Sequence, residues 1–236
     1  MSFTTLTIFT LQPGQRRWGL AQMGTSPGPL KRVPGLRFFK LLGSGAANGF
    51  GLWPNLDRYG LMAVWDSTGA AAAFFGQHPL WHQYRRRSAE LWTVQLAPLK
   101  AHGRWDGQAP FDSPAPRPPA ASNSPVAVLT RASIRWRKAL RFWQFVEPTS
   151  AALAQTPGVR AAIGLGELPV VRQATFSVWE SAQAMQDYAY KDVRHREVIQ
   201  LTRRENWYAE ELFVRFQVLS STGTLDGYDP LAGLLA

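Results

Sequence analysis

One histidine of the chain has the sequence surroundings of an interior ligand. Four side chains share one stripe at helical spacing: Ala184, Tyr188, His195 and Ile199. The residues on either side of His195 are arginines, which point in other directions, so the imidazole is aimed at the interior. This pattern fits a core histidine bonded to a backbone carbonyl, and it also fits an axial ligand of haem iron.

The absence of cysteine narrows the chemistry that this chain can perform. It excludes disulfides, thiolate zinc sites, iron–sulfur clusters and thiolate-ligated haem. A bound redox metal must then use histidine, tyrosine, methionine or carboxylate ligands. Together with the aromatic-rich second half, this favours a macrocycle held by the neutral imidazole of His195.

The other candidate motifs carry weaker signals. His78 and His82 have a spacing compatible with a metal site, but Pro79 should break the helix there and no carboxylate pair is adjacent. An exposed helix junction is the favoured interpretation. The glycine-rich run at 43–49 lacks the Lys-Ser/Thr of a phosphate-binding loop, so a sharp bend or a close backbone approach explains it better.

A strand expected at 170–179 places Gln173, Thr175 and Ser177 on one face. Polar side chains in a central strand are costly to bury unless they find partners. They either line a ligand pocket or bond to neighbouring elements, and the sequence leaves both possibilities open.

The elements that must position these residues follow the same order in both halves of the chain. The first half is expected to contain a strand at 5–11, a helix at 36–42, a strand at 60–65, a helix at 68–89 and a strand at 91–99. The second half is expected to contain a strand at 126–134, a helix at 138–153, a strand at 170–179, a helix at 182–204 and a strand at 212–219.

Local motifs support an internal repeat. A strand ending in tryptophan is followed by an acidic residue and a helix cap at 65–68 and again at 179–181, and a glycine-rich turn precedes it at 43–45 and 164–166. These patterns predict an α+β fold of two tandem ferredoxin-like units. Because each sheet would have helices on one face only, the two sheets should cover each other in an intramolecular α/β barrel with helices outside.

A proline-rich segment divides the chain nearly in half, since residues 106–125 contain six prolines and almost no aliphatic residues. The predicted organisation comprises an N-terminal ferredoxin-like half at 1–105, a linker at 106–125, a C-terminal ferredoxin-like half with the candidate haem site at 126–220 and a tail at 221–236.

Composition limits the location and the partners. The chain lacks an apolar run of roughly 20 residues and its start does not resemble a signal peptide, so a cytoplasmic location is expected, with peripheral contact at the inner membrane face left open. The net charge of +10 suggests an acidic partner: nucleic acid, an anionic membrane or an electron-transfer protein. The densest basic clusters fall at expected helix ends, so nucleic-acid binding is not favoured.

Taken together, several colinear segments resemble the spheroidene monooxygenase family of carotenoid ketolases, within the haem-dependent dimeric α/β-barrel superfamily. The matching segments are 22–24, 33–45, 49–50, 54–55, 63–65, 105–107, 110–111, 129–132, 142–143, 173–179, 195 and 210–216. This sequence departs from the family pattern at 46–48.

The resemblance implies a monooxygenase that uses haem b, O2 and a ferredoxin-type electron donor to convert C-2 of an acyclic carotenoid to a ketone. His195 matches the family histidine that we assign as the iron ligand. As cofactor contacts we expect Tyr188, Ile199 and Phe176. The apolar substrate would be taken from the membrane surface.

As distal groups near bound oxygen we expect Gln173, Thr175 and Arg131, because a neutral imidazole lacks the electron push of a thiolate. Two alternatives remain open for the same scaffold. One is a non-catalytic protein that binds or traffics haem, and the other is a cofactor-free monooxygenase of the related barrel family.

Overall fold

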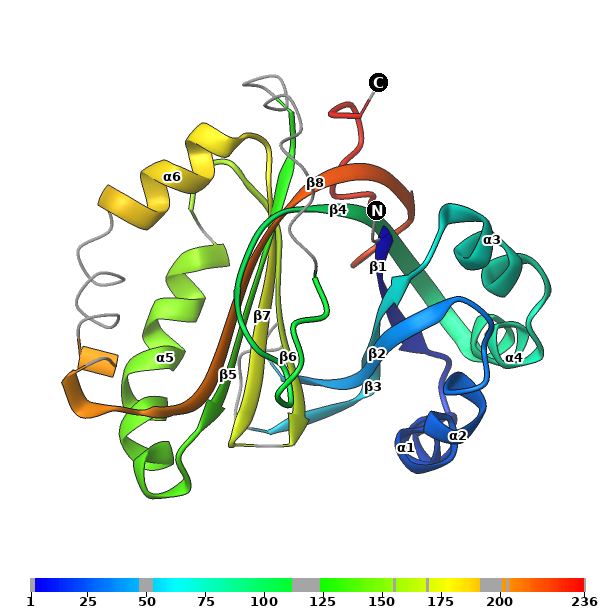
Figure 1. Ribbon diagram of the computed structural model, residues 1–236, viewed down its shortest axis with the longest axis horizontal. Helices are drawn as coiled ribbons and strands as arrows, with labels where there is room; N and C mark the ends of the chain where they lie inside the picture. The colour runs from blue at the N-terminus through cyan, green and yellow to red at the C-terminus, as the bar shows by residue number, and fades with distance from the viewer. Residues whose placement is uncertain are drawn as a thin grey trace.

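Figure 1 shows a computed structural model of the chain, which describes residues 3–46, 53–111, 124–154, 156–168, 170–191, 201–202 and 204–235. The strands are β1 (Phe3–Leu11), β2 (Leu36–Gly45), β3 (Pro54–Trp65), β4 (Ser88–Gly103), β5 (Val126–Ile134), β6 (Val159–Leu168), β7 (Arg172–Trp179) and β8 (Tyr208–Gly223). The helices are α1 (Arg16–Thr25), α2 (Pro27–Leu30), α3 (Thr68–Gln77), α4 (Pro79–Arg87), the 3-10 helix η1 (Trp136–Lys138), α5 (Ala139–Ala154) and α6 (Ala182–Lys191).

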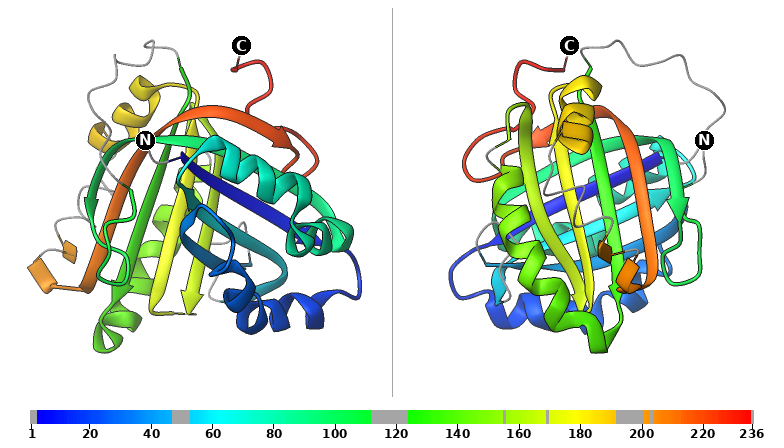
Figure 2. Two further views of the ribbon diagram at one scale, coloured as in Figure 1. Left: turned by 45° about the vertical axis from the view of Figure 1, so that its right-hand side comes forward. Right: turned by 90° about the vertical axis from the view of Figure 1, so that its left-hand side faces the viewer.

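The described strands close into one antiparallel barrel in the order β1-β3-β2-β6-β7-β5-β8-β4. Strands β1–β4 form one half and β5–β8 the other, and the halves join where β4 pairs with β8 and β2 pairs with β6. The strands of the two halves run across each other with helices on the outside (Figure 2). The predicted α+β fold and the intramolecular barrel are therefore confirmed.

Alternation along the strands separates an inner from an outer face. The inner residues of both halves form one buried apolar cluster that includes Leu6, Val94, Phe176 and Phe216. The outer residues pack under helices in separate clusters, one in the N-terminal half and two in the C-terminal half. Each sheet thus provides the cover for the other sheet's inner face.

Two reciprocal clasps join the halves. The carboxylate of Glu210 on β8 accepts hydrogen bonds from the backbone N–H groups of 106–107, at 2.9 and 2.7 Å. The carboxylate of Glu90 on β4 accepts the same pair of bonds from 226–227, at 3.1 and 2.7 Å. Each turn directly follows the long strand of one half and is held by the long strand of the other, so the repeat extends to single residues.

The two helix starts that follow tryptophan are also built alike. Ser67 accepts a hydrogen bond from the N–H of Ala70, and Ser181 accepts one from the N–H of Ala184, both at 3.1 Å. In the first half the helix then stops at Gln77 and restarts at Pro79, as proline in a helix interior requires. In the described parts of the chain, none of the helices has the length and apolar character that a bilayer crossing demands.

The structure corrects the expected helix at 36–42, which is part of strand β2. Both faces of β2 contact apolar neighbours, Phe38 and Leu42 in the barrel and Leu41 and Phe39 under the helices. The resulting apolar run has no period of two and resembles a helix stripe. The glycine-rich segments at 43–45 and 164–166, expected as turns, likewise lie in strands β2 and β6.

Strand β6 and helix α1 were not predicted, because the first is rich in alanine and glycine and the second has no apolar stripe. The expected helix at 182–204 is described only as far as Lys191 and, beyond it, at 201–202 and 204 onward. The proposed division at 106–125 stays a prediction, since 112–123 lie outside the described residues.

Glycine is required at the turns that lead into β2 and β6, where each turn lies against the start of a serine-capped helix. Gly35 and Gly158 have φ of +74° and +82°, and a Cβ there would lie 2.5 Å from Cβ of Ala70 and 2.6 Å from Cβ of Ala184. We expect Gly35→Ala and Gly158→Ala each to lower the free energy of unfolding by about 2 kcal/mol, measured by urea denaturation. Gly24→Ala is the control, because its Cβ would meet nothing within 4 Å. An equal loss in all three variants would contradict the expectation.

Candidate functional site

The barrel interior is filled by side chains. Trp92, Trp105, Phe176 and Phe216 are fully buried in it, within the single inner cluster. Among the described residues, close packing of this kind makes the interior a poor place for a large ligand. The outside of the barrel is therefore the better candidate for a binding site.

The outer face of the N-terminal sheet is also covered. Helices α1–α4 pack on it through a cluster rich in aromatic rings, including Trp65, Phe74 and Tyr84. At its centre Thr7 on β1 is fully buried, and its hydroxyl lies 2.9 Å from the hydroxyl of Thr93 on β4. The outer face of the N-terminal sheet is therefore fully packed against its helices.

Among the described residues, α5 and α6 cover the outer face of the C-terminal sheet. Helix α5 packs around Phe142 and Trp207 at one end and adds Leu153 to the cluster at the other end, where α6 packs around Met185 and Trp179. Between the two clusters Thr130 is exposed, although β5 is a central strand between β7 and β8. Figure 1 shows α5 and α6 on this side of the barrel.

The internal repeat shows how unusual this exposure is. Trp65 pairs with Phe3, and Trp179 pairs with Val126, so Thr130 in the second half corresponds to Thr7 in the first. Thr7 is fully buried and Thr130 is exposed. The same position in the same scaffold is covered in one half and open in the other.

The strand register defines what surrounds Thr130 on this face. Its neighbours across the strands are Thr175 on β7 and Phe213 on β8, both half-buried. Next to Thr175 lies Gly164 on β6, and next to Phe213 lies the exposed His102 on β4. We call this set, Gly164, Thr175, Thr130, Phe213 and His102, the Thr130 row.

A buried polar atom adjoins the Thr130 row. Arg215 lies two residues beyond Phe213 on the same face of β8, and its Nε is buried without a hydrogen-bond partner in the described part of the chain. An N–H left unpaired in the interior carries a free-energy penalty, and a ligand with an acceptor oxygen would remove it. Arg215 is therefore a candidate ligand-binding group.

The structure brings some of the predicted site residues together on this face. Gln173 and Thr175 lie on it as half-buried residues, and Tyr188 of α6 stacks near Trp179 with ring centroids 5.3 Å apart. His195 and Ile199 lie outside the described residues. The described residues before and after that segment belong to α6 and to the cluster around Trp207, which contains Leu201, and both pack on this face.

Two other predicted residues point to the opposite side. Phe176 and Arg131 face the barrel interior, where Arg131 is 2% exposed. Thr175 and Phe176 are consecutive on β7, so they cannot line the same surface. Arg131 is likewise separated from Gln173 and Thr175 by the sheet itself.

Arg131 belongs to an ion network at one end of the barrel. Its guanidinium donates to Glu210, lies 3.3 Å from Oδ1 of Asp106 and lies 3.9 Å from Oε1 of Glu167. Lys40 pairs with Asp106, and Arg172 lies 3.3 Å from Glu167. Three carboxylates thus compensate three cations. In the first half, the residue that corresponds to Arg131 is the apolar Ile8.

The network shifts the ionisation of Glu210. Burial alone would raise its pKa, but the N–H groups of Gly107 and Asp106 and the guanidinium of Arg131 outweigh that effect and lower it. A carboxylate with a lowered pKa stabilises the fold above its unfolded-state pKa, near 4.3, and loses that contribution as the pH falls through the folded value.

Sequence reasoning missed Thr130, Phe213, Arg215 and His102 as members of one surface. The available signal was a threonine in the middle of the apolar strand 126–134, opposite the polar positions of 170–179. His78, by contrast, caps helix α4 by accepting from the N–H of Leu80 at 3.2 Å. In the ranges that the structure describes, no cluster of three histidine or carboxylate groups could hold a metal ion.

Comparison with known sequences gives consistent relatives. The chain is 41% identical to the spheroidene monooxygenase of Rubrivivax gelatinosus over 94% of this chain and 84% of the relative. It is 36% identical to that of Cereibacter sphaeroides over the whole chain and 72% of the relative, and 37% identical to that of Rhodobacter capsulatus over 91% and 89%. No protein-family model matches the chain.

Solved structures share the fold at low sequence identity. An aldoxime dehydratase superimposes with a TM-score of 0.58 and 12% identity over 94% of this chain and 83% of that chain. A second aldoxime dehydratase, solved with butyraldoxime, gives 0.54 and 11% identity over 93% and 79%. At this identity the likeness shows the two-unit barrel and nothing of the reaction.

The asymmetry between Thr130 and Thr7 predicts different responses to a large side chain. We expect Thr130→Phe to change the free energy of unfolding by less than about 0.5 kcal/mol, because the position is open. Thr7→Phe should lower it by about 3 kcal/mol, because the same residue would overpack a filled cluster. Urea denaturation of both variants measures this difference. Equal losses would mean that Thr130 is covered.

The two clasps predict the contribution of the ion network. Glu210→Gln should lower the free energy of unfolding by about 3 kcal/mol at neutral pH, because it leaves the charge of Arg131 undercompensated. Glu90→Gln should cost about 1 kcal/mol, because it loses one of the same two backbone bonds but leaves no interior arginine undercompensated. Chemical denaturation from pH 7 to pH 3 should show the Glu210→Gln deficit shrinking below about pH 4. A deficit that stays constant with pH would argue against the lowered pKa.

Proposed function

Because this chain belongs to the spheroidene monooxygenase family, whose members are oxidoreductases, we propose that it is a haem-dependent monooxygenase with its cofactor on the outer face of the C-terminal sheet. One observation carries the placement: Thr130 is exposed on a central strand where its counterpart Thr7 is buried. The proposal assigns that open face to haem b and its substrate.

The residues on this face suit a porphyrin. Gly164 and the two threonines of the Thr130 row are small, so a flat macrocycle could approach the sheet closely, while Phe213 offers an apolar contact. The buried Nε of Arg215 is a donor without a partner in the described residues, and a propionate would satisfy it. The fit rests on this combination of small, apolar and cationic groups.

In this proposal His195 would hold the haem iron through its imidazole. Tyr188 and Ile199 would contact the macrocycle. Gln173 and Thr175 are the distal groups, since their side chains share the face with the Thr130 row. Arg131, on the opposite face, contributes through the ion network that anchors β5 and β8.

The proposed substrate is an acyclic carotenoid, oxidised at C-2 with O2 and electrons from a ferredoxin-type donor. Bound haem iron would supply the activation of oxygen. Two hydroxylations at one carbon give a geminal diol, which loses water to form the ketone. The protein's part is to hold the apolar chain beside the haem on this face and to exclude water from the reacting carbon. The reaction would take place in the cytoplasm, at the membrane that contains the carotenoid.

The haem assignment is tested by replacing single imidazoles. We expect His195→Ala to abolish the Soret band of the haem-loaded protein and to lower haem retention on a desalting column at least about tenfold. His102→Ala is the matched control, because His102 is an exposed imidazole in the Thr130 row, and its variant should keep the band. Loss of the band in His102→Ala alone would transfer the ligand role to that residue. Full retention in both variants would refute axial ligation by either histidine.

The reaction itself is tested with the haem-loaded protein, a reduced ferredoxin and spheroidene in detergent. Ketone formation with reductant-dependent oxygen uptake supports the monooxygenase. Haem binding without oxygen uptake identifies a haem carrier, and ketone formation without a Soret band identifies a cofactor-free enzyme.

A further inference from the structure

Two large apolar side chains project from one turn of the chain at the junction of β5 and α5. Trp136 of η1 is 75% exposed, and Leu140 of α5 is 85% exposed. The same turn fixes itself to the protein with other residues: Phe142 is buried, and the indole N–H of Trp143 donates to the carbonyl of Val170 at 3.0 Å. Trp136 and Leu140 are therefore not needed to hold α5 in place.

Cations surround this apolar pair. Arg135, Arg137, Lys138 and Arg141 lie within seven consecutive residues, and the sequence from 135 to 146 contains no acidic residue. The guanidinium of Arg137 lies over the ring of Trp136 at 5.0 Å. Glu205 lies beside this group: Nε of Arg141 is 3.6 Å from its carboxylate, and Lys138 also interacts with it electrostatically. Arg135 and Arg137 are exposed and extend the positive surface.

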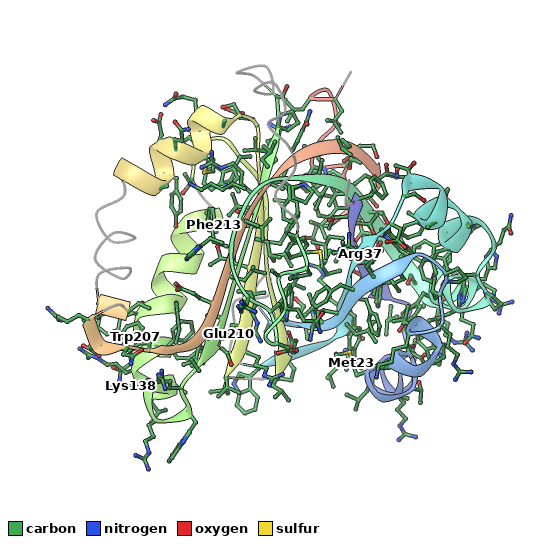
Figure 3. All side chains as sticks on the ribbon, viewed as in Figure 1. Met23, Arg37, Lys138, Trp207, Glu210 and Phe213 are labelled. Atoms are coloured by element: carbon green, nitrogen blue, oxygen red, sulfur yellow. The ribbon has the colours of Figure 1, made fainter. Side chains whose placement is uncertain are left out.

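The position of this turn relates it to the candidate site. Figure 3 shows Lys138 at the lower end of α5, close to Trp207. Strand β5 leads directly from Thr130 to Ile134 and on to η1, a distance of about 13 Å along four strand residues. A partner bound at this turn would therefore lie at the end of the strand that contains Thr130.

We propose that the turn at 135–141 is a docking surface for an anionic lipid bilayer. Tryptophan and leucine enter the interfacial layer while arginine and lysine contact lipid phosphates. An acidic protein would be attracted by the same cations, and the combination of an exposed tryptophan and leucine with arginine and lysine favours the bilayer interface over it. The purpose of the surface rests on the proposed function, because a water-insoluble substrate must be collected from a membrane. The binding of the turn to a bilayer does not depend on that function.

The test uses the full-length protein and carotenoid-free vesicles. Sedimentation should show binding to vesicles of phosphatidylglycerol mixed with phosphatidylcholine, weaker binding to phosphatidylcholine alone, and weaker binding as salt is raised. The double variant Trp136→Ala/Leu140→Ala and the double variant Arg135→Gln/Arg137→Gln should each lower the vesicle affinity by about tenfold. Their thermal unfolding should match that of the unaltered protein, because the replaced side chains are exposed.

Arg85→Gln/Arg86→Gln is the charge-matched control on α4, where both arginines are exposed. It should leave vesicle binding unchanged. An equal loss in the control would show that overall charge, rather than this turn, attracts the bilayer, and would overturn the proposal. A failure of the unaltered protein to bind anionic vesicles would also overturn the proposal. This includes the case in which the turn binds an acidic ferredoxin instead. Either failure leaves the monooxygenase proposal standing, since haem and substrate are absent from the assay.

Discussion

The fold depends on the mutual burial of two apolar sheet faces. Each half has helices on one side only, so its inner face would meet water if the other half did not cover it. Closure of the barrel through the β4–β8 and β2–β6 pairings also removes every open strand edge among the described strands. The clasps of Glu90 and Glu210 fix the two halves at the points where one long strand ends beside the start of the other. These contacts hold the outer faces, and any site on them, in a constant position.

The halves have the same plan and differ in what covers them. In the first, Thr7 is buried under aromatic rings, and the interior position beside it is Ile8. In the second, Thr130 is open and the neighbouring interior residue is Arg131, held by three carboxylates. An arginine in a barrel core is tolerated only when its charge is compensated. The open face and the ion network therefore lie back to back on one strand, the first suited to a ligand and the second to anchoring β5.

Much of the architecture could be predicted because its signals are local. The tryptophan–serine motifs, the alternation in β4 and β8, and Pro79 each act through neighbouring residues. The segment at 36–42 was assigned to a helix because a strand buried on both faces shows no alternation, and β6 was missed because its glycines and alanines give little apolar signal. The site was harder to predict. The partners of Arg131 come from three distant parts of the chain, and the exposure of Thr130 depends on how elements far from it in the sequence pack on its face of the sheet. Neither the ion partners of Arg131 nor the exposure of Thr130 can be predicted from the residues adjacent in the sequence.

The duplication within one chain has a consequence for how such a protein can evolve. In a homodimer of single units, one codon specifies the same position in both subunits, so any substitution that opens one outer face opens its symmetry mate as well. Once both units belong to a single gene, Thr7 and Thr130 are inherited separately. One unit can then keep a fully packed outer face that stabilises the fold, while the other acquires functional residues. The aromatic cluster under the helices of the N-terminal half is consistent with such a division.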